Sequence, residues 1–254
     1  MRAGWTGATL QATNRLYTDL SWLWPLWGEA GTEYAHYCER VVALVRQYAG
    51  REIGTLLDIG CGGGKNMFNL KRCFDVTGLD LSPAMLAQAK ELNPECTFVH
   101  GDMRSFRLNR GFDAILMDDA IAHMSRREDW VATLRTAYAH LNPGGVMIVT
   151  PDVTVESFQQ NRTTTFSASK GELDVVFVEN VYDPDPTDTH YETTILYLIR
   201  ERGVLRIESD HWRMGLYALD TWKQVLRETG FQVHEKRYRA DDDEYVMFAC
   251  VRPV

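Results

Sequence analysis

Apolar residues recur at two different spacings along the chain, and the two spacings alternate through its middle part. Between residues 33 and 48 they follow the spacing of an amphipathic helix, and Gly50 ends that pattern. Short buried strands are predicted at 55–59, 76–79, 97–100, 112–117 and 146–150. Helices are predicted between them, over 65–71, from Ser82-Pro83 onward, and from a capping box at 125–128 to residue 140. Such alternation predicts a parallel sheet with helices on both faces.

The pattern changes after Pro151. No convincing helix is predicted between 153 and 216. Runs rich in β-branched and aromatic residues instead predict strands at 174–182, 191–201 and 204–212. Arg202-Gly203 joins the last two as an antiparallel hairpin. A helix over 220–229 and strands over 231–237 and 245–252 complete the predicted seven-stranded, mostly parallel α/β sheet.

The chain is therefore expected to be one α/β domain with an inserted antiparallel β cap. Its four expected segments are a tryptophan-rich lid or anchor (1–32), a ligand-binding core (33–151), the cap (152–216) and a C-terminal helix with strands (217–254). The first segment holds four of the seven tryptophans, Trp5, Trp22, Trp24 and Trp27. Most of them are expected to pack the segment onto the sheet, and a lid that faces a cation is the alternative.

Composition and charge narrow the function classes. The net charge of −8 argues against a general nucleic-acid binder, which needs a basic face. No run of 18 apolar residues predicts a membrane span, and no signal peptide is apparent. The five cysteines are scattered and predict neither a disulfide framework nor a zinc ribbon, so a cytoplasmic protein is expected.

The strongest chemical signal is the sequence from Leu57 to Gly64, LDIGCGGG, in which a buried strand runs into glycines. Glycines let a backbone turn sharply and approach a ligand closely. The dinucleotide pattern Gly-x-Gly-x-x-Gly fails because its last position is Lys65. The Walker A pattern fails because Asn66 follows that lysine and residue 59 is isoleucine. What remains is Asp-x-Gly-x-Gly-x-Gly, which begins at Asp58.

This pattern resembles the class I S-adenosylmethionine-dependent methyltransferases, over residues 33–150 and less specifically at the C-terminus. The resemblance implies their Rossmann-like fold, with S-adenosylmethionine as methyl donor and S-adenosylhomocysteine as product. It implies that Asp58 helps to hold the cofactor ammonium, Asp80 the ribose hydroxyls and Asp102 the adenine amino group, while Asp118 lies near the sulfonium. The full set of implied cofactor-binding residues is Tyr17, Asp58, Gly60, Cys61, Gly62, Asp80, Leu81, Met85, Gly101, Asp102, Met103 and Asp118.

The cap gives a closer resemblance, to small-molecule N-methyltransferases that dimethylate amino groups of deoxysugars. In that family a tyrosine near the N-terminus and a histidine after the fourth strand approach the amine, and Tyr17 and His123 match those places. The sequence departs from the family where Asp118-Asp119 replaces small or apolar residues. It departs again at 241–244, where four acids replace an expected arginine and would repel a pyrophosphate. These departures favour a neutral or cationic amine over a nucleotide-linked sugar.

The expected reaction is methyl transfer to an amine nitrogen by in-line displacement. His123 is expected to take the amine proton, and Tyr17 to bond the acceptor or close over the cofactor. Asp119, Trp212 and Tyr217 are expected to contact a small-molecule acceptor. No metal is expected, because the Asp-Asn pair of magnesium-dependent O-methyltransferases is absent after the fifth strand and no zinc motif is present. A small-molecule O-methyltransferase and a non-catalytic cofactor-binding regulator remain alternatives, and the protein is expected to be a monomer or homodimer.

Overall fold

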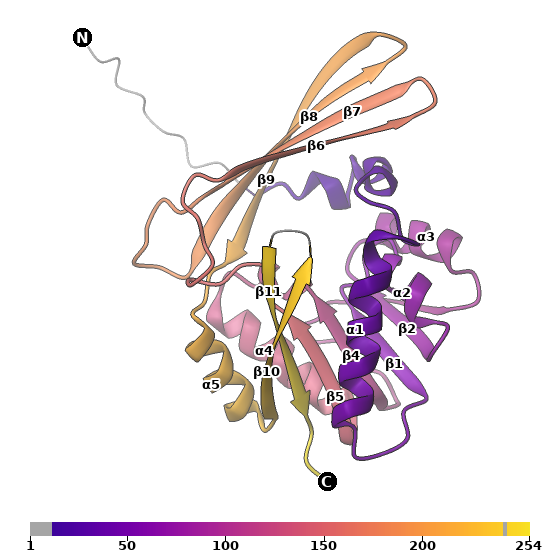
Figure 1. Ribbon diagram of the computed structural model, residues 1–254, viewed down its shortest axis with the longest axis vertical. Helices are drawn as coiled ribbons and strands as arrows, with labels where there is room; N and C mark the ends of the chain where they lie inside the picture. Colours follow the sequence, from indigo (N-terminus) through magenta and orange to yellow (C-terminus); the bar gives the residue numbers. More distant parts are fainter. Residues whose placement is uncertain (1–11, 241–242) are drawn as a thin grey trace.

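A seven-stranded sheet forms the centre of the computed structural model, which describes residues 12–240 and 243–254 (Figure 1). The strand order is β10-β11-β5-β4-β1-β2-β3. All neighbours from β5 to β3 are parallel, and β11 is antiparallel to both β5 and β10. The strands are β1 (Thr55–Ile59), β2 (Asp75–Asp80), β3 (Thr97–His100), β4 (Phe112–Asp118), β5 (Leu141–Thr150), β10 (Gln232–Ala240) and β11 (Asp243–Val251). The predicted α/β fold is confirmed.

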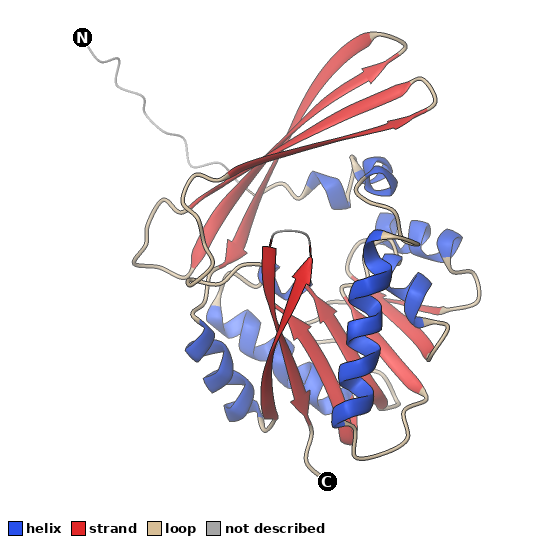
Figure 2. Cartoon of the chain, in the orientation of Figure 1, coloured by secondary structure: helices blue, strands red, loops and turns tan. Residues whose placement is uncertain are grey.

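Helices cover both faces of this sheet (Figure 2). They are α1 (Glu33–Tyr48), α2 (Lys65–Leu70), α3 (Pro83–Leu92), α4 (Arg127–His140) and α5 (Leu219–Thr229). Successive strand residues point to opposite faces, so Leu56 packs in the cluster that contains α1, and Leu57 in the cluster that contains α4 and α5. The helix predicted at 33–48 has the observed bounds of α1. Ser82 caps α3 as predicted, because its side chain accepts the amide hydrogen of Met85 at 3.2 Å.

A second, four-stranded antiparallel sheet lies over the carboxyl ends of the central strands (Figure 1). It consists of β6 (Thr163–Lys170), β7 (Leu173–Tyr182), β8 (His190–Glu201) and β9 (Val204–Gly215). Two short 3-10 helices, η1 (Arg15–Tyr17) and η2 (Ser21–Leu26), pack against its inner face. The apolar contacts join Leu16, Leu20 and Leu23 to Val175, Phe177, Ile195, Tyr197 and Ile199. The tryptophan-rich segment is thereby anchored between the two sheets, and Trp5 lies outside the described residues.

Three local predictions were wrong. Strand β6 was missed because it is an edge strand whose side chains are mostly polar and exposed. The capping box at 125–128 does not form, because Arg126 is the N-cap residue of α4 and makes no side-chain cap. The strand predicted at 146–150 begins too late, because β5 starts at Leu141 and pairs with β4 through an irregularity between Phe112 and Ala114.

Among the described residues, no helix has the length and apolar character needed to cross a membrane.

Candidate active site at the carboxyl ends of the strands

The glycine loop between β1 and α2 adopts a backbone that only glycines tolerate well. Gly60, Gly62 and Gly64 have φ angles of +74°, +51° and +80°, in the left-handed region. Close approach adds a second constraint, because a Cβ atom at Gly63 would lie 2.5 Å from Nε1 of Trp24. A Cβ atom at Gly60 would overlap the side chain of Ala120. Side chains from other segments, such as those of Trp24 and Ala120, therefore pack directly against the backbone of the loop.

Asp58 lies under this loop and is almost fully buried, at 1% exposure. Its Oδ2 atom has no hydrogen-bond partner within the described chain. Burial raises the pKa of Asp58 well above the usual value, and the nearby Asp118 and Asp80 raise it further. An ammonium group would satisfy this oxygen and offset the repulsion, so the site fits the amino group of S-adenosylmethionine.

Asp80 is the last residue of β2, and each of its carboxylate oxygens accepts a hydrogen bond from a backbone amide. Oδ2 accepts the Gly62 amide at 2.8 Å, and Oδ1 accepts the Ser82 amide at 2.8 Å. Burial nevertheless raises the pKa of Asp80. Each carboxylate oxygen can accept more than one hydrogen bond, so acceptor capacity remains for a pair of ribose hydroxyls. Close by, Met85 is fully buried, with its Cε 3.5 Å from a Cβ position at Gly62.

The residues predicted around the adenine lie after β3. The Gly101 amide donates to Asp80 O at 3.0 Å, and Met103 Cε reaches within 3.5 Å of a Cβ position at Gly60. Asp102 is held by Arg104, whose Nε lies 2.9 and 3.0 Å from its two oxygens, and this pair lowers the pKa of Asp102. Arg104 also bonds Asp129 at the start of α4 at 3.2 Å. Of the remaining two predicted residues, Leu81 is 61% exposed and Cys61 is buried.

Tyr17 and His123 lie next to each other near the carboxyl end of β4. Tyr17 ends η1, and His123 ends the 3-10 helix η3 (Ala120–His123) that follows β4. The Tyr17 hydroxyl lies 3.3 Å from Nε2 of His123. Trp212 of β9 stacks on the Tyr17 ring with centroids 5.3 Å apart, and the two rings are inclined by 26°. Burial lowers the pKa of His123 to about 4, so its imidazole is neutral at pH 7.

Asp210 fixes this aromatic group in place. Its side chain is fully buried and accepts four hydrogen bonds. Two tie down the N-terminal segment, from the Leu16 amide at 2.8 Å and Thr13 Oγ1 at 2.6 Å. The other two, from Trp212 Nε1 at 2.8 Å and the His211 amide at 2.9 Å, come from β9 itself. Sequence reasoning missed this residue, because nothing local distinguishes it from other acids in the cap.

Three carboxyl groups, those of Asp118, Asp119 and Asp152, lie where β4 and β5 end. Asp118 accepts from Asn66 Nδ2 at 2.9 Å. Asp119 has a φ angle of +50°, which is uncommon outside glycine, and its side chain is exposed to solvent. Burial raises the pKa of Asp118 and that of Asp152, the latter to about 6, and the charge of Asp118 adds to the shift of Asp152. Within residues 12–240 and 243–254, no three or more His, Cys, Asp or Glu side chains, these acids included, are arranged so that together they could hold a metal ion.

The structure does not bring Tyr217 to this group. Tyr217 is 4% exposed and stacks on Trp130 of α4 with centroids 4.3 Å apart. Its hydroxyl donates to the Met124 carbonyl at 3.2 Å, so the side chain is a member of the hydrophobic core.

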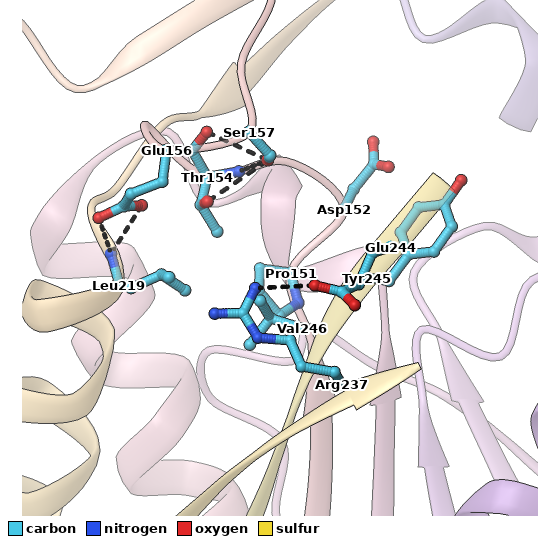
Figure 3. A pocket seen from close by; sticks show the side chains of 10 residues that line it. All are labelled: Pro151, Asp152, Thr154, Glu156, Ser157, Leu219, Arg237, Glu244, Tyr245 and Val246. Carbon is cyan, nitrogen blue, oxygen red and sulfur yellow. Dashed lines mark hydrogen bonds and ion pairs between the residues drawn. The ribbon is translucent and has the colours of Figure 1, made fainter. Parts of the chain in front are cut away.

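A small pocket opens beside Asp152, between the loop after β5, the start of α5 and the β10–β11 hairpin. Figure 3 shows Arg237 and Glu244 pointing toward each other there. Arg237 Nη1 lies 3.7 Å from Glu244 Oε2. Glu244 also lies 3.6 Å from Arg239. Within the acidic run predicted to repel a pyrophosphate, Asp241 and Asp242 lie outside the described residues. Glu244 pairs with both arginines of the same hairpin.

Comparison with known proteins agrees with this architecture. Residues 56–145 match the model of a methyltransferase domain. The dTDP-3-amino-3,6-dideoxy-alpha-D-glucopyranose N,N-dimethyltransferase of Streptomyces fradiae is 31% identical over 205 residues, which cover 80% of this chain and 79% of that protein. The dTDP-4-amino-2,3,4,6-tetradeoxy-D-glucose N,N-dimethyltransferase of Saccharopolyspora spinosa is 28% identical over 80% of each chain.

Solved structures give the same result. DesVI of Streptomyces venezuelae superposes with a TM-score of 0.79 at 25% identity, covering 96% of this chain and all of that one. CalS10 of Micromonospora echinaspora, an amino pentose methyltransferase solved with bound S-adenosylmethionine, gives a TM-score of 0.78 at 20% identity over 96% and 99% of the two chains. The resemblance predicted from the glycine loop and the cap is confirmed. The chain belongs to the class I S-adenosylmethionine-dependent methyltransferases, in the family of the sugar N,N-dimethyltransferases.

Proposed function

We propose that this protein methylates the amino group of an aminosugar, with S-adenosylmethionine as donor. The observation that carries the proposal is the Tyr17–His123 pair, which lies beside a glycine loop whose buried Asp58 has an unsatisfied oxygen. One end of the site thus suits the cofactor, and the other offers groups that can orient an amine and take a proton. The named substrates of the two curated relatives are dTDP-linked aminosugars.

The cofactor residues proposed are those predicted from the sequence. Asp58 would accept from the ammonium, Asp80 from the ribose hydroxyls, and the loop after β3 would face the adenine. When bound, S-adenosylmethionine supplies a methyl group that its sulfonium already activates for displacement. The protein therefore needs mainly to align the acceptor nitrogen, which is a matter of proximity and orientation.

The amine must be neutral to attack, because an ammonium has no lone pair. Burial lowers the pKa of an amine, whereas carboxylates such as Asp119 and Asp152 raise it and attract the cationic form. We propose that these acids draw the ammonium in, that Asp152, whose pKa burial raises to about 6, takes up its proton, and that the neutral imidazole of His123 accepts a hydrogen bond from the nitrogen. The Tyr17 hydroxyl, within hydrogen-bond reach of His123, would orient the nitrogen, and Trp212 would cover the sugar ring.

Acceptor turnover tests this proposal. The protein is incubated with S-adenosylmethionine and a panel containing a dTDP-linked 3-amino-3,6-dideoxyglucose, unlinked amino sugars and phenols. Methylated amine and released S-adenosylhomocysteine are the expected products. Turnover on phenols alone would overturn the assignment of nitrogen as the acceptor atom.

A further inference from the structure

Beside the glycine loop, Asn93 Oδ1 and two further buried polar atoms lack hydrogen-bond partners within the described chain, and these two further atoms are of opposite kinds. One is the acceptor Oδ2 of Asp58, and the other is the donor Nε1 of Trp24. Leaving such a group unsatisfied in the interior costs about 1–3 kcal/mol, so native proteins seldom do so without a reason. The amino-acid part of S-adenosylmethionine carries one ammonium and one carboxylate, which are the two partners these atoms lack.

Trp24 lies directly on the loop. A Cβ atom at Gly63 would come within 2.5 Å of Trp24 Nε1, and one at Gly62 would lie 3.4 Å from Cζ2. The pyrrole edge of the indole therefore faces the second half of the loop, while Asp58 lies before its first glycine. The donor thus contacts the loop at Gly63, and the acceptor belongs to the residue two positions before the first glycine.

Lys65, the first residue of α2, holds Trp24 in this place. Its Nζ donates to the Trp24 carbonyl at 2.9 Å and lies 4.8 Å from the centroid of the Trp24 ring. The ring of Tyr34 is 5.5 Å away on α1. Lys65 is only 5% exposed, and burial lowers its pKa to about 8, so its ammonium is still mainly charged at pH 7 and would stabilise a carboxylate beside the loop.

We propose that Trp24 is a cofactor-binding residue whose indole N–H donates to the carboxylate of S-adenosylmethionine, and that Lys65 positions it. The inference rests on the proposed function for the presence of the cofactor and adds residues that the family resemblance did not supply. From the sequence alone, the tryptophans of this segment are expected mainly to pack it onto the sheet.

Trp24 Nε1 is sealed from solvent, so the cofactor can reach it only if the N-terminal segment moves. Besides Lys65, two side chains of the core donate to backbone carbonyls of this segment, Ser82 Oγ to Tyr17 O at 2.5 Å and Gln88 Nε2 to Ser21 O at 2.7 Å. These hydrogen bonds can break and reform, whereas the buried Leu16, Leu20 and Leu23 keep the segment packed on the inner face of the four-stranded sheet, so that the two would move together.

The test compares two ligands, S-adenosylhomocysteine and 5′-methylthioadenosine, which lacks the amino-acid part. In Trp24→Phe we expect about tenfold weaker binding of S-adenosylhomocysteine by calorimetry and little change for 5′-methylthioadenosine. Lys65→Met should weaken the same ligand selectively, and Lys65→Arg should restore part of the loss. Trp22→Phe is the matched control, since Trp22 lies in the same 3-10 helix and is 40% exposed.

A readout on the unmodified chain does not depend on how the variants fold. With indole nitrogens labelled, the Trp24 N–H resonance, identified by its loss in Trp24→Phe, should move downfield with S-adenosylhomocysteine and not with 5′-methylthioadenosine. Equal weakening of both ligands in Trp24→Phe, or an indole resonance that ignores the amino-acid part, overturns the role of Trp24. Failure of the unmodified protein to bind S-adenosylhomocysteine at all would instead overturn the proposed function.

Discussion

The hydroxyl of Tyr17 lies 3.3 Å from Nε2 of His123, although the two residues are 106 positions apart in the chain. The contact joins the N-terminal segment to the turn that follows β4. We expect His123→Ala to lower kcat by about a hundredfold while the dissociation constant of S-adenosylhomocysteine changes by less than about twofold. Steady-state kinetics and calorimetry measure the two quantities. Unchanged kcat with a lower Tm would show that His123 only supports the turn.

The carboxylate of Asp80 is predicted to hold the cofactor ribose. Replacement by alanine removes an acceptor of the Gly62 and Ser82 amides as well as of the ribose hydroxyls. We expect Asp80→Ala to weaken S-adenosylhomocysteine binding at least tenfold, a loss of about 1.4 kcal/mol or more, with the far-UV circular dichroism spectrum retained. Asp75→Ala, at the exposed start of the same strand, is the control and should bind normally. An affinity unchanged in Asp80→Ala would refute the ribose assignment.

The sequence predicted the central sheet better than the cap. Strands such as β1 and β4 are nearly continuous apolar runs, so their position follows from burial alone. Strand β6 carries threonine, serine and lysine around one large apolar residue, Phe166, and is recognisable only by its pairing with β7. Local pattern does not encode such edge pairing.

The residues of the site divide in the same way, into those that the local sequence predicts and those that it does not. Asp58 and Asp80 could be located because each lies at the carboxyl end of a predictable strand. Trp24, Lys65 and Asp210 could not, because their roles arise from contacts between segments remote in sequence. Tyr217 shows the converse error, since position near the cap suggested an acceptor contact while burial against Trp130 places it in the core.

Asp152 makes stability depend on pH in a defined direction. Burial first, and then Asp118, raise its pKa to about 6 in the folded protein, against about 3.9 in an unfolded chain. Between these values the folded state binds more protons, so the free energy of unfolding contributed by this group falls as pH rises from about 4 to about 6. Asp152→Asn should therefore have a higher Tm than the unmodified protein at pH 8 and a similar Tm near pH 4. Asp75→Asn is the exposed control, and equal Tm values at pH 8 would contradict the prediction.

Glu244 is expected to limit the use of nucleotide-linked acceptors. It lies 3.7 Å from Arg237 and 3.6 Å from Arg239, and so occupies the two arginines that could otherwise meet a pyrophosphate. These side chains are well exposed, so the effect is modest. We expect Glu244→Gln to lower KM for a dTDP-linked aminosugar about two- to threefold and to leave KM for an unlinked amine unchanged. A KM that rises for the dTDP-linked acceptor would show that Glu244 supports its binding.

The transfer of a methyl group to nitrogen is tested most directly by mass spectrometry of the acceptor after incubation with S-adenosylmethionine. The structure predicts an aminosugar product that has gained one or two methyl groups on its amine, with matching release of S-adenosylhomocysteine, and predicts that His123→Ala forms it far more slowly. An acceptor recovered unmethylated across the amine panel, from protein shown to bind S-adenosylhomocysteine, would contradict the account.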